Sequence, residues 1–502
     1  MSDGTYRIKA RCLGLDTHHE AIVFLHHDSA ICRSEGFTAH NRILLRAGDK
    51  QVVATMFSVT SDWVKQDEAA LSNAAWNRLA LSEGDEIVIQ HLDPIDSLSL
   101  LRSRIYGHEL SENSLRSIIG DIVDGRYSNI HISAFLTTCA TRPMTDREVL
   151  ALTRAMVDAG ERLSWPSPIV VDKHSVGGLP GNRTTPIIVS IVTALGLVMP
   201  KTSSRAITSP AGTADTMETL APVDLDDATI RRVVAEEGGC IAWGGAIQLS
   251  PADDVLIRVE RSLDIDTPGQ MTASVLSKKV AAGATHLVLD MPVGATAKVR
   301  TAEEAKELAR GLLAVSEDFG IKARVLTGNG DQPVGRGIGP ALEARDVLAV
   351  LQCQPDAPAD LRERALQLAG ALIELAGVAR PDAGAALAAA VLNDGRAWRK
   401  FQRICEAQGG MRVPPRSKHR KPILADKSGH IAEIDNRKIA RLAKLAGAPD
   451  DKAAGVEMQV QLGQPVLAGD ELCIVHAESP GELDYAFDYA KAHRDMFRIA
   501  NT

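Results

Sequence analysis

Aromatic residues are scarce in this chain, at 4% of 502 residues, and a long apolar run is missing. The longest apolar stretch, from Pro186 to Pro200, is too short to span a bilayer and contains Ser190, Thr193 and Gly196. The first residues lack the basic and apolar regions of a secretory signal. We therefore expect no membrane span and no signal peptide.

Cysteines spaced as zinc ligands are also missing. The seven cysteines are scattered, odd in number and never in CxxC spacing, which is typical of reduced thiols in a cytoplasmic protein. His26-His27-Asp28 resembles a metal cluster, but no further ligand spacing accompanies it, so we interpret it as ordinary strand and turn residues. We expect no metal site.

The net charge of −8 disfavours a nucleic-acid partner bound through the overall field, so any anion site must be local. The motif GxxxxGK[ST] is absent, which disfavours a P-loop enzyme, and no GxSxG supports an α/β-hydrolase. Gly335 to Gly339 lacks the GxGxxG spacing of dinucleotide-binding folds, and we interpret it as a structural turn.

What the chain does contain is a strand, a glycine-rich loop and a helix start between Ile169 and Pro186. Pro186 fits the first turn of a helix, where its missing N–H costs nothing. Backbone N–H groups at such a junction form a cradle for anions. Lys173, Ser175 and Thr184 would add an ammonium and two hydroxyls, so the sequence predicts a phosphate site.

A second loop of small hydroxylic residues, from Lys201 to Asp215, follows the next predicted strand. Strand and helix alternate from Pro168 to about Gln352, which indicates a parallel α/β sheet. Ligands of such sheets sit at the carboxyl ends of the strands. We therefore expect both loops to converge on one ligand.

The fold we predict is a multidomain α/β protein with four parts. Short β-prone segments separated by turns indicate a small N-terminal β-barrel. Apolar stripes and a capping box at Thr145 and Glu148 indicate helices. The expected parts are a barrel at 1–92, a helical domain at 97–165 that later helices could join, a central α/β domain with a mostly parallel sheet at 166–413, and a C-terminal α+β domain at 422–502.

One chemistry that needs a doubled anion site is phosphorolysis, in which inorganic phosphate attacks an anomeric carbon. Cations and N–H groups hold the phosphate on one face of the sugar, and the leaving base is stabilised on the other. His174 or a carboxylate could protonate that base. The residues alone place this reaction only modestly ahead of a generic phosphosugar enzyme.

The segments Asp172 to Gly178, Ser203 to Arg205 and Ala211 to Glu218 closely resemble the signature of the thymidine/pyrimidine nucleoside phosphorylase family. The resemblance covers nearly the whole chain from about residue 97. The N-terminal barrel and the sequence segments SVGGLPGN and SSRAITS resemble those of the branch that contains AMP phosphorylases and type-2 thymidine phosphorylases. Further matching segments follow in order: Pro251 to Asp253, Ala273 to Lys279, Gln332 to Gly335, and Gln408 to Gly410.

The resemblance implies a role for individual residues. It implies phosphate binding by Lys173, Ser175, Thr184, Ser203 and Thr213. For thymidine phosphorylases it implies pyrimidine binding by Ser274, Lys278 and, with a one-residue gap, Arg258. For the AMP phosphorylase branch it implies substrate contacts at Gly178, Ser204, Arg205, Ala206, Ile207, Thr208, Ser209, Thr213, Ser274 and Lys298.

In that branch Asp266 would donate the proton to the leaving base, whereas on the residues alone it is a turn residue before Thr267-Pro268-Gly269. The family also implies phosphate as a co-substrate without a cofactor, and a homodimer or higher homo-oligomer. Ordinary thymidine phosphorylases carry a histidine in a GHTGGT-like segment, where this chain has Ser209-Pro210-Ala211-Gly212-Thr213. A site richer in donors could seat a substrate 5′-phosphate.

Four hypotheses follow. The first is a pentosyltransferase that splits thymidine or a related pyrimidine nucleoside into base and (deoxy)ribose 1-phosphate. The second is a phosphorylase of nucleoside 5′-monophosphates such as AMP, CMP or UMP, which yields ribose 1,5-bisphosphate. The third is a phosphoribosyltransferase, although the loops lack an acidic pair suited to magnesium–diphosphate. The fourth, from another class, is a non-catalytic metabolite-binding protein.

Overall fold

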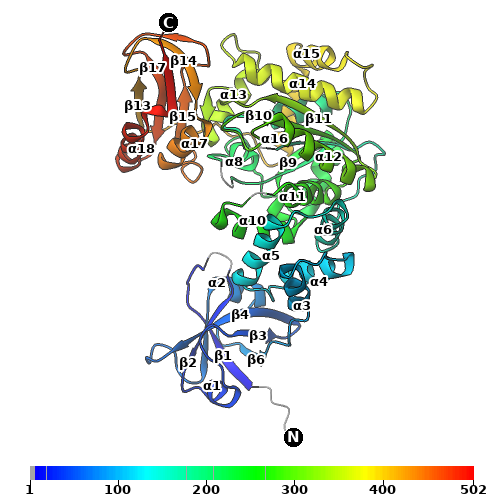
Figure 1. The fold of residues 1–502 in the computed structure, drawn as a ribbon, viewed down its shortest axis with the longest axis vertical. Helices are drawn as coiled ribbons and strands as arrows, with labels where there is room; N and C mark the ends of the chain where they lie inside the picture. The colour runs from blue at the N-terminus through cyan, green and yellow to red at the C-terminus, as the bar shows by residue number, and fades with distance from the viewer. Residues whose placement is uncertain (1–5, 18–19, 177, 207–208, 266, 502) are drawn as a thin grey trace. The chain divides into compact units, whose positions relative to one another are not determined.

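The computed structural model describes residues 6–17, 20–176, 178–206, 209–265 and 267–501. Figure 1 shows the order of the helices and strands along the chain. By its internal contacts the chain divides into two compact units, Met1–Arg142 with Val255–Ile265, and Pro143–Asp254 with Asp266–Thr502.

The first unit begins with a closed barrel whose strand order is β1-β5-β2-β4-β3-β6. Alternate residues such as Val23, Leu25, Ile43 and Leu45 are fully buried inside it, as the period of two along a strand requires. The predicted N-terminal barrel is therefore confirmed. Its elements are β1 (Tyr6–Cys12), β2 (Ile22–His26), α1 (Ala30–Glu35), β3 (Arg42–Ala47), β4 (Lys50–Val59), β5 (Glu68–Leu71), α2 (Asn73–Leu79) and β6 (Glu86–His91).

Helices make up the rest of the first unit. On α4 the predicted apolar stripe is buried at Leu115, Ile118, Ile119 and Ile122, and Gly125 follows the helix with φ of +69°. The helices are α3 (Ser97–Ile105), α4 (Glu112–Val123), α5 (Asn129–Thr141) and the part of α10 (Pro251–Leu263) from Val255 onward.

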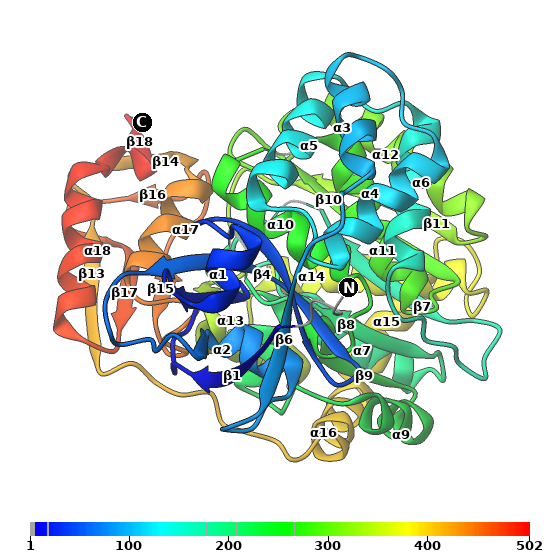
Figure 2. The same ribbon diagram turned by 90° about the horizontal axis from the view of Figure 1, so that it is seen from below.

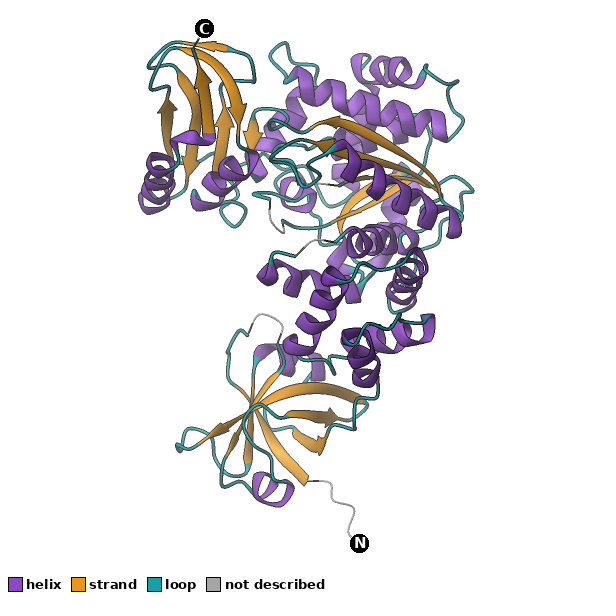
Figure 3. Ribbon diagram, in the orientation of Figure 1, coloured by secondary structure: helices purple, strands orange, loops and turns teal. Residues whose placement is uncertain are grey.

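The second unit contains a parallel sheet in the order β11-β10-β7 and a parallel pair, β8 with β9. A single parallel bridge from Val170 to Val198 joins them. Helices surround these strands (Figure 3). The strands are β7 (Val171–Ser175), β8 (Met199–Ser203), β9 (Gly239–Trp243), β10 (His286–Val293) and β11 (Lys322–Asn329).

The core of this α/β part forms around α7, whose residues from Thr185 to Thr193 are all buried. An all-round apolar helix is expected in the centre of a large domain. The Ala-rich sequence from Leu366 to Leu392 forms parts of two helices, which are separated near Gly377, a residue with φ of +75°. The helices are α6 (Asp146–Asp158), α7 (Thr185–Ala194), α8 (Thr213–Glu218), α9 (Asp227–Glu237), η1 (Gly244–Ala246), α11 (Pro268–Ala281), α12 (Ala302–Asp318), α13 (Pro340–Leu351), α14 (Ala359–Leu375), α15 (Gly384–Asn393) and α16 (Arg396–Ala407).

The C-terminal part of the second unit has two antiparallel sheets, β12-β15-β17-β13 and β16-β14-β18. Helix α18 lies beside β13 and β17 (Figure 2). Gly335 to Gly339 is not only a turn, because Gly337 and Ile338 form β12 and pair with β15. The elements are β12 (Gly337–Ile338), β13 (His419–Leu424), β14 (Gly429–Ile434), α17 (Asn436–Leu445), β15 (Gly455–Met458), β16 (Pro465–Val466), β17 (Glu471–Ala477), α18 (Pro480–Ala492), η2 (Arg494–Met496) and β18 (Phe497–Ala500).

Candidate active site

The predicted cradle lies where β7 ends and α7 begins. Thr184 is the N-cap residue of α7, and proline stands in the first turn, as the sequence indicates. The parallel register of β7 with β10 places Ser175 opposite Asp290. The first loop therefore lies at the carboxyl ends of two neighbouring strands, the place where open α/β sheets bind ligands.

Lys173 is the buried cation of this cradle, with 2% of its surface exposed. Its Nζ donates to Ser175 Oγ at 2.7 Å and to Thr184 Oγ1 at 2.9 Å. Burial lowers the pKa of Lys173 to about 8, against the opposing influence of Asp290. The structure thus brings together three of the predicted phosphate ligands.

Asp290, on β10, is a residue that the sequence analysis missed. Its carboxylate accepts hydrogen bonds from Ser175 Oγ, from Asn182 Nδ2 at 3.0 Å and from Arg364 Nη2 at 2.7 Å, and it lies 3.8 Å from Lys173 Nζ. Burial raises the pKa of Asp290, but Lys173 and Arg364 outweigh it, so the net pKa is lowered. A lone acid inside the apolar strand HLVLDMPV was the available signal.

A second buried carboxylate, Asp172, pairs with two lysines. Lys201 Nζ lies 3.0 Å from Asp172 Oδ1, and Lys279 Nζ lies 2.6 Å from Oδ2. Burial lowers the pKa of Lys279 to about 7. Burial and then the charges of Lys279 and Lys201 lower the pKa of His174 well below its usual value. This lowered pKa favours the neutral form of His174.

Arg183 ties the first loop to the second. Its Nη1 donates to Thr213 Oγ1 at 2.6 Å, and its Nη2 donates to the carbonyl of Ala211 at 2.8 Å. The third nitrogen, Nε, donates to Glu343 Oε2 at 2.6 Å, and the same oxygen accepts from Thr216 Oγ1. An arginine and a glutamate that the sequence analysis did not select therefore hold the two loops together, and their convergence on one ligand stays a prediction.

Arg205, predicted to contact substrate, is held by acidic residues of α8. Its guanidinium donates to both oxygens of Glu218 at 2.8 Å and to Asp215 Oδ1 at 3.3 Å. It also stacks over the ring of Trp243, 5.0 Å from the centroid. Lys452 joins the cluster, 3.0 Å from Glu218 Oε2. The charge of Arg205 is therefore already neutralised by carboxylates of the protein itself.

The other described residues of the second loop contribute mainly backbone groups. The amide of Ala206 donates to Asp215 Oδ2, and the carbonyl of Ser204 accepts from Ala214. Ser209 Oγ donates to the carbonyl of Ala211. Ser203 Oγ is buried and has no hydrogen-bond partner in the described part of the chain. Gly178, in the first loop, is exposed with φ of +55°.

The predicted base-binding residues lie on several elements. Ser274 and Lys278 are one turn apart on α11, both half-buried, and Lys278 forms an ion pair with buried Asp253. Lys298 is exposed in the segment after β10. Arg258 lies on α10 within the first unit. Three further predicted residues lie outside the described part of the structure: Ile207, Thr208 and Asp266.

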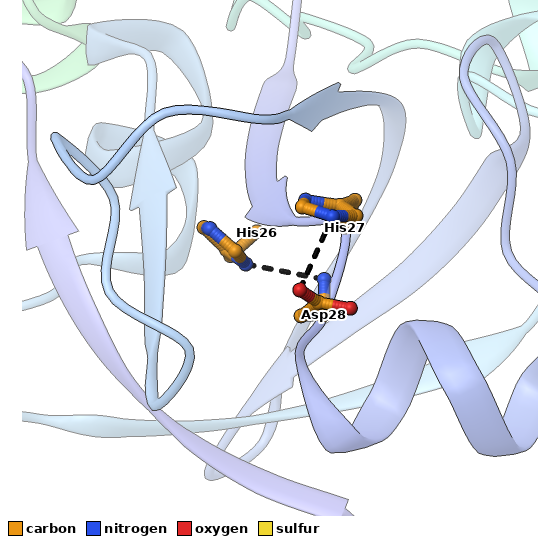
Figure 4. A group of neighbouring side chains, drawn as sticks. All are labelled: His26, His27 and Asp28. Atoms are coloured by element: carbon orange, nitrogen blue, oxygen red, sulfur yellow. Dashed lines mark hydrogen bonds and ion pairs between the residues drawn. The ribbon is translucent and has the colours of Figure 1, made fainter.

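His26, His27 and Asp28 come together in the first unit, with potential ligand atoms within 4.8 Å of one another (Figure 4). His26 Nδ1 accepts from the amide of Asp28, and His27 Nε2 lies 3.2 Å from the Asp28 carboxylate. Arg33 already neutralises that carboxylate at 2.7 Å. The Asp28 carboxylate therefore already has two partners, His27 and Arg33.

No helix within the described residues is both long and apolar enough to cross a bilayer. Comparison with known proteins begins with three family models. They are described as the helical bundle domain of a glycosyl transferase family (residues 98–160), the α/β domain of a glycosyl transferase family (167–398) and a pyrimidine nucleoside phosphorylase C-terminal domain (430–496).

Full-length relatives also match. A protein of Sphingopyxis alaskensis named "Putative thymidine phosphorylase" is 58% identical over 497 residues, which are 99% of this chain and 96% of that protein. A Chelativorans protein with the same name is 57% identical over 98% of this chain and 97% of its own length.

Among solved structures, anthranilate phosphoribosyltransferase from Thermus thermophilus has a TM-score of 0.51 at 22% identity, covering 61% of this chain and 98% of its own. The Saccharomyces cerevisiae enzyme, solved with PRPP and Mg, has the same TM-score at 15% identity, covering 62% and 97%. At these identities the likeness establishes a shared fold.

Proposed function

Because the chain belongs to the glycosyl transferase family that these models and relatives define, we propose that it is a pentosyltransferase that splits a pyrimidine nucleoside with inorganic phosphate. The proposed products are the free base and (deoxy)ribose 1-phosphate. A phosphate oxygen forms the new bond to C1′, and the C1′–N bond breaks. The base leaves with that electron pair and takes up a proton.

The observation that carries the proposal is an excess of positive charge among the buried and half-buried ion pairs of the α/β part. Six cations, Lys173, Arg183, Lys201, Lys278, Lys279 and Arg364, pair with four carboxylates, Asp172, Asp253, Asp290 and Glu343. Lys279 has a pKa of about 7 and is only partly charged at neutral pH. The remaining excess of one to two charges suits a phosphate mono- or dianion.

We assign the phosphate to Lys173, Ser175, Thr184, Ser203 and Thr213. An ammonium has three donors, and Lys173 directs two of them to Ser175 and Thr184. The third can serve a phosphate oxygen. With a pKa of about 8, Lys173 is protonated at neutral pH, which this role requires. These groups orient the attacking oxygen and offset charge as the bond to C1′ forms.

We assign the base to Ser274 and Lys278 of the second unit, and its protonation to Asp266. The base contact that the family resemblance implies for Arg258, in the first unit, stays a prediction. His174 is the weaker candidate for proton donor, because burial and the surrounding lysines keep its imidazole neutral. A neutral imidazole still offers one N–H and one acceptor nitrogen. We therefore propose that His174 orients the sugar or base by hydrogen bonding.

We propose thymidine or a related pyrimidine nucleoside as the substrate rather than a nucleoside 5′-monophosphate. A second phosphate would need a further cation near the second loop. Arg205 carries that charge in the sequence, but Glu218 and Asp215 already neutralise it. The AMP phosphorylase alternative would require Arg205 to leave Glu218, and an ionised, two-point contact of this kind is among the strong hydrogen bonds.

We further propose that the enzyme uses no cofactor beyond its co-substrate phosphate, that it acts as a cytoplasmic homodimer or larger homo-oligomer, and that it binds neither nucleic acid nor membranes. The free cysteines support a reducing compartment. We also propose that the chain has four domains, at residues 1–92, 97–165, 166–413 and 422–502. Mass measurement of the native protein in solution tests the oligomeric state.

The deciding experiment is chromatography of products from thymidine, uridine, cytidine, AMP, CMP and UMP, each with and without phosphate. We expect phosphate-dependent release of thymine or uracil from the nucleosides. Cleavage of the monophosphates alone would refute the substrate, and cleavage without phosphate would refute phosphorolysis. Lys173→Ala should abolish turnover; unchanged phosphate-dependent activity would refute the role of the cradle.

A further inference from the structure

Lys452, in the C-terminal part of the second unit, contacts the helix α8 that follows the second loop. Its Nζ lies 3.0 Å from Glu218 Oε2 and 3.7 Å from Asp215 Oδ1, both on α8. Neither the sequence motifs nor the proposed chemistry uses Lys452. Its contacts nevertheless lead directly to the backbone that carries the predicted substrate contacts.

Asp215 is the link between that lysine and the loop backbone. One of its oxygens, Oδ2, accepts from the amide of Ala206 at 2.6 Å and from the amide of Gly212 at 2.9 Å. The same carboxylate thus holds the loop on both sides of its middle. With 2% exposure Asp215 is buried, so an uncompensated charge there would be costly.

The backbone around Gly212 leaves little space for rearrangement. A Cβ at Gly212 would lie 2.5 Å from the carbonyl oxygen of Ser204 and 2.7 Å from the amide nitrogen of Ala206. The two limbs of the loop therefore pack directly on each other. A change in the Asp215 carboxylate is transmitted to residues 204–206 and to Thr213 at the same time.

The charges of the cluster balance only when Lys452 is included. Arg205 and Lys452 carry two positive charges, and Asp215 and Glu218 carry two negative charges. The hydrogen bonds of Arg205 lower the pKa of Glu218 to about 2, and Lys452 adds to this. Loss of Lys452 would leave one excess negative charge beside a loop proposed to bind phosphate.

Lys452 is itself fixed by backbone contacts rather than by its own flexible chain. Its carbonyl accepts from the amide of Ala341 at 3.0 Å. Just beyond it, a Cβ at Gly455 would lie 2.0 Å from the carbonyl oxygen of Ile338, and a Cβ at Gly339 would lie 2.3 Å from that of Ala454. Two glycines are thus needed for the close backbone approach that places Lys452 over α8.

We propose that Lys452 is a positioning residue that acts through Glu218 and Asp215 to hold the second loop in its binding-competent form, and that the C-terminal part thereby sets the affinity for phosphate. This inference rests on the proposed function for its kinetic consequence. Lys452 contacts neither Lys173 nor Thr213 in the described structure and has no role in the chemical step. It acts on the fraction of enzyme whose loop is ready to bind.

The kinetic test uses Lys452→Met, with Lys452→Arg as the conservative variant and Lys491→Met as a matched control. Lys491 is an exposed lysine of the same C-terminal part, paired with Asp488 three residues earlier. If the loop loses part of its competent population, apparent affinity falls by that fraction. We expect the KM for phosphate to rise about fivefold in Lys452→Met, the upper range for a partly exposed ion pair, with little change in kcat.

Lys452→Arg should restore most of the affinity, and Lys491→Met should behave as wild type. Glu218→Gln should raise the same KM, and the double variant Lys452→Met/Glu218→Gln should lose less than the sum of the two single effects, because the lysine acts in part through that carboxylate. Additive effects, a KM unchanged in Lys452→Met, or a loss confined to kcat would overturn the proposal.

A second readout is independent of activity. Hydrogen exchange of peptides covering residues 203–218 should be faster in Lys452→Met, because the amides of Ala206 and Gly212 lose a fixed acceptor. Unchanged hydrogen exchange in that segment would refute the positioning role of Lys452 even if the kinetic constants changed. If the wild-type enzyme cleaves no pyrimidine nucleoside, the proposed function fails. Faster exchange in Lys452→Met would still support the role of Lys452 in positioning the second loop.

Discussion

Replacing Asp290 by Asn should change the pH dependence of phosphate binding, because this carboxylate helps to keep Lys173 protonated. The two groups lie 3.8 Å apart and are both buried. Unit charges about 4 Å apart interact by about 4 kcal/mol at an effective dielectric constant near 20. Burial has already lowered the pKa of Lys173 to about 8. Since a pKa change of one corresponds to ~1.4 kcal/mol, losing Asp290 should take that pKa below neutrality.

The sign follows from the role of the ammonium. Lys173 serves phosphate only when protonated, so wild-type affinity for phosphate should weaken as the pH rises through about 8. In Asp290→Asn the same weakening should occur at lower pH. Near pH 7.5 the KM for phosphate should rise roughly 10- to 100-fold, because a hydrogen bond to a charged group is worth about 1.5–3 kcal/mol.

The assay is the KM for phosphate measured across the pH range for both proteins, so that the ionisation of phosphate itself cancels in the comparison. Asp227→Asn is the matched control, since Asp227 is an exposed acid of the same α/β part paired with Arg231. Its profile should coincide with that of wild type. If the Asp290→Asn profile also coincides with wild type, Asp290 does not maintain the charge of Lys173 and the reasoning fails.

Three further predictions concern stability. Gly455→Ala should lower the free energy of unfolding by about 3 kcal/mol or more, because φ of +146° is strained for alanine and the new Cβ would lie 2.0 Å from a carbonyl oxygen. Gly463→Ala is the control, with φ of +79° and open space around the new Cβ, and should lower it less. Urea titration measures both. Burial raises the pKa of Asp346 from 3.8 to about 6, so the stability that its protonated form contributes is full below about pH 4 and is lost as the pH rises through 6. Asp346→Asn should therefore remove roughly 3 kcal/mol from the change in the free energy of unfolding over that pH range. An unchanged dependence of the free energy of unfolding on pH would refute the raised pKa. Arg183→Met should destabilise by about 3–5 kcal/mol, since it leaves the carboxylate of Glu343 buried; a melting temperature equal to wild type would contradict this.

Local patterns predicted much of this fold. The capping box at Thr145 and Glu148 forms at the start of α6, because the two residues are neighbours on one helical turn. The strand, loop and helix around Lys173 also follow from adjacent residues, including the proline in the first turn of α7. The barrel was predicted from short β-prone segments separated by turn residues, and the structure closes six strands into that barrel.

The organising partners of the site could not be predicted, because they are distant in sequence. Asp290 meets Ser175 across 115 positions, and Glu343 meets Arg183 across 160. Only the register of β7 with β10 and the placement of α13 bring them together. Arg205 shows the converse limit, since its residue type suggests an anion ligand and its neighbours Glu218 and Asp215 reveal an internal ion pair.

These distant carboxylates have opposing effects on the proposed reaction. Each lies within the proposed phosphate site and therefore reduces the attraction of that site for an anion. Without Asp290, however, burial would discharge Lys173, and without Glu343 the guanidinium of Arg183 would keep only the carbonyl of Ala211 as a second anchor for its contact with Thr213. Transition-state stabilisation depends on donors that are oriented before the charge develops. The carboxylates thus weaken the attraction for phosphate, but they keep the cations of the proposed site protonated and oriented before phosphate binds.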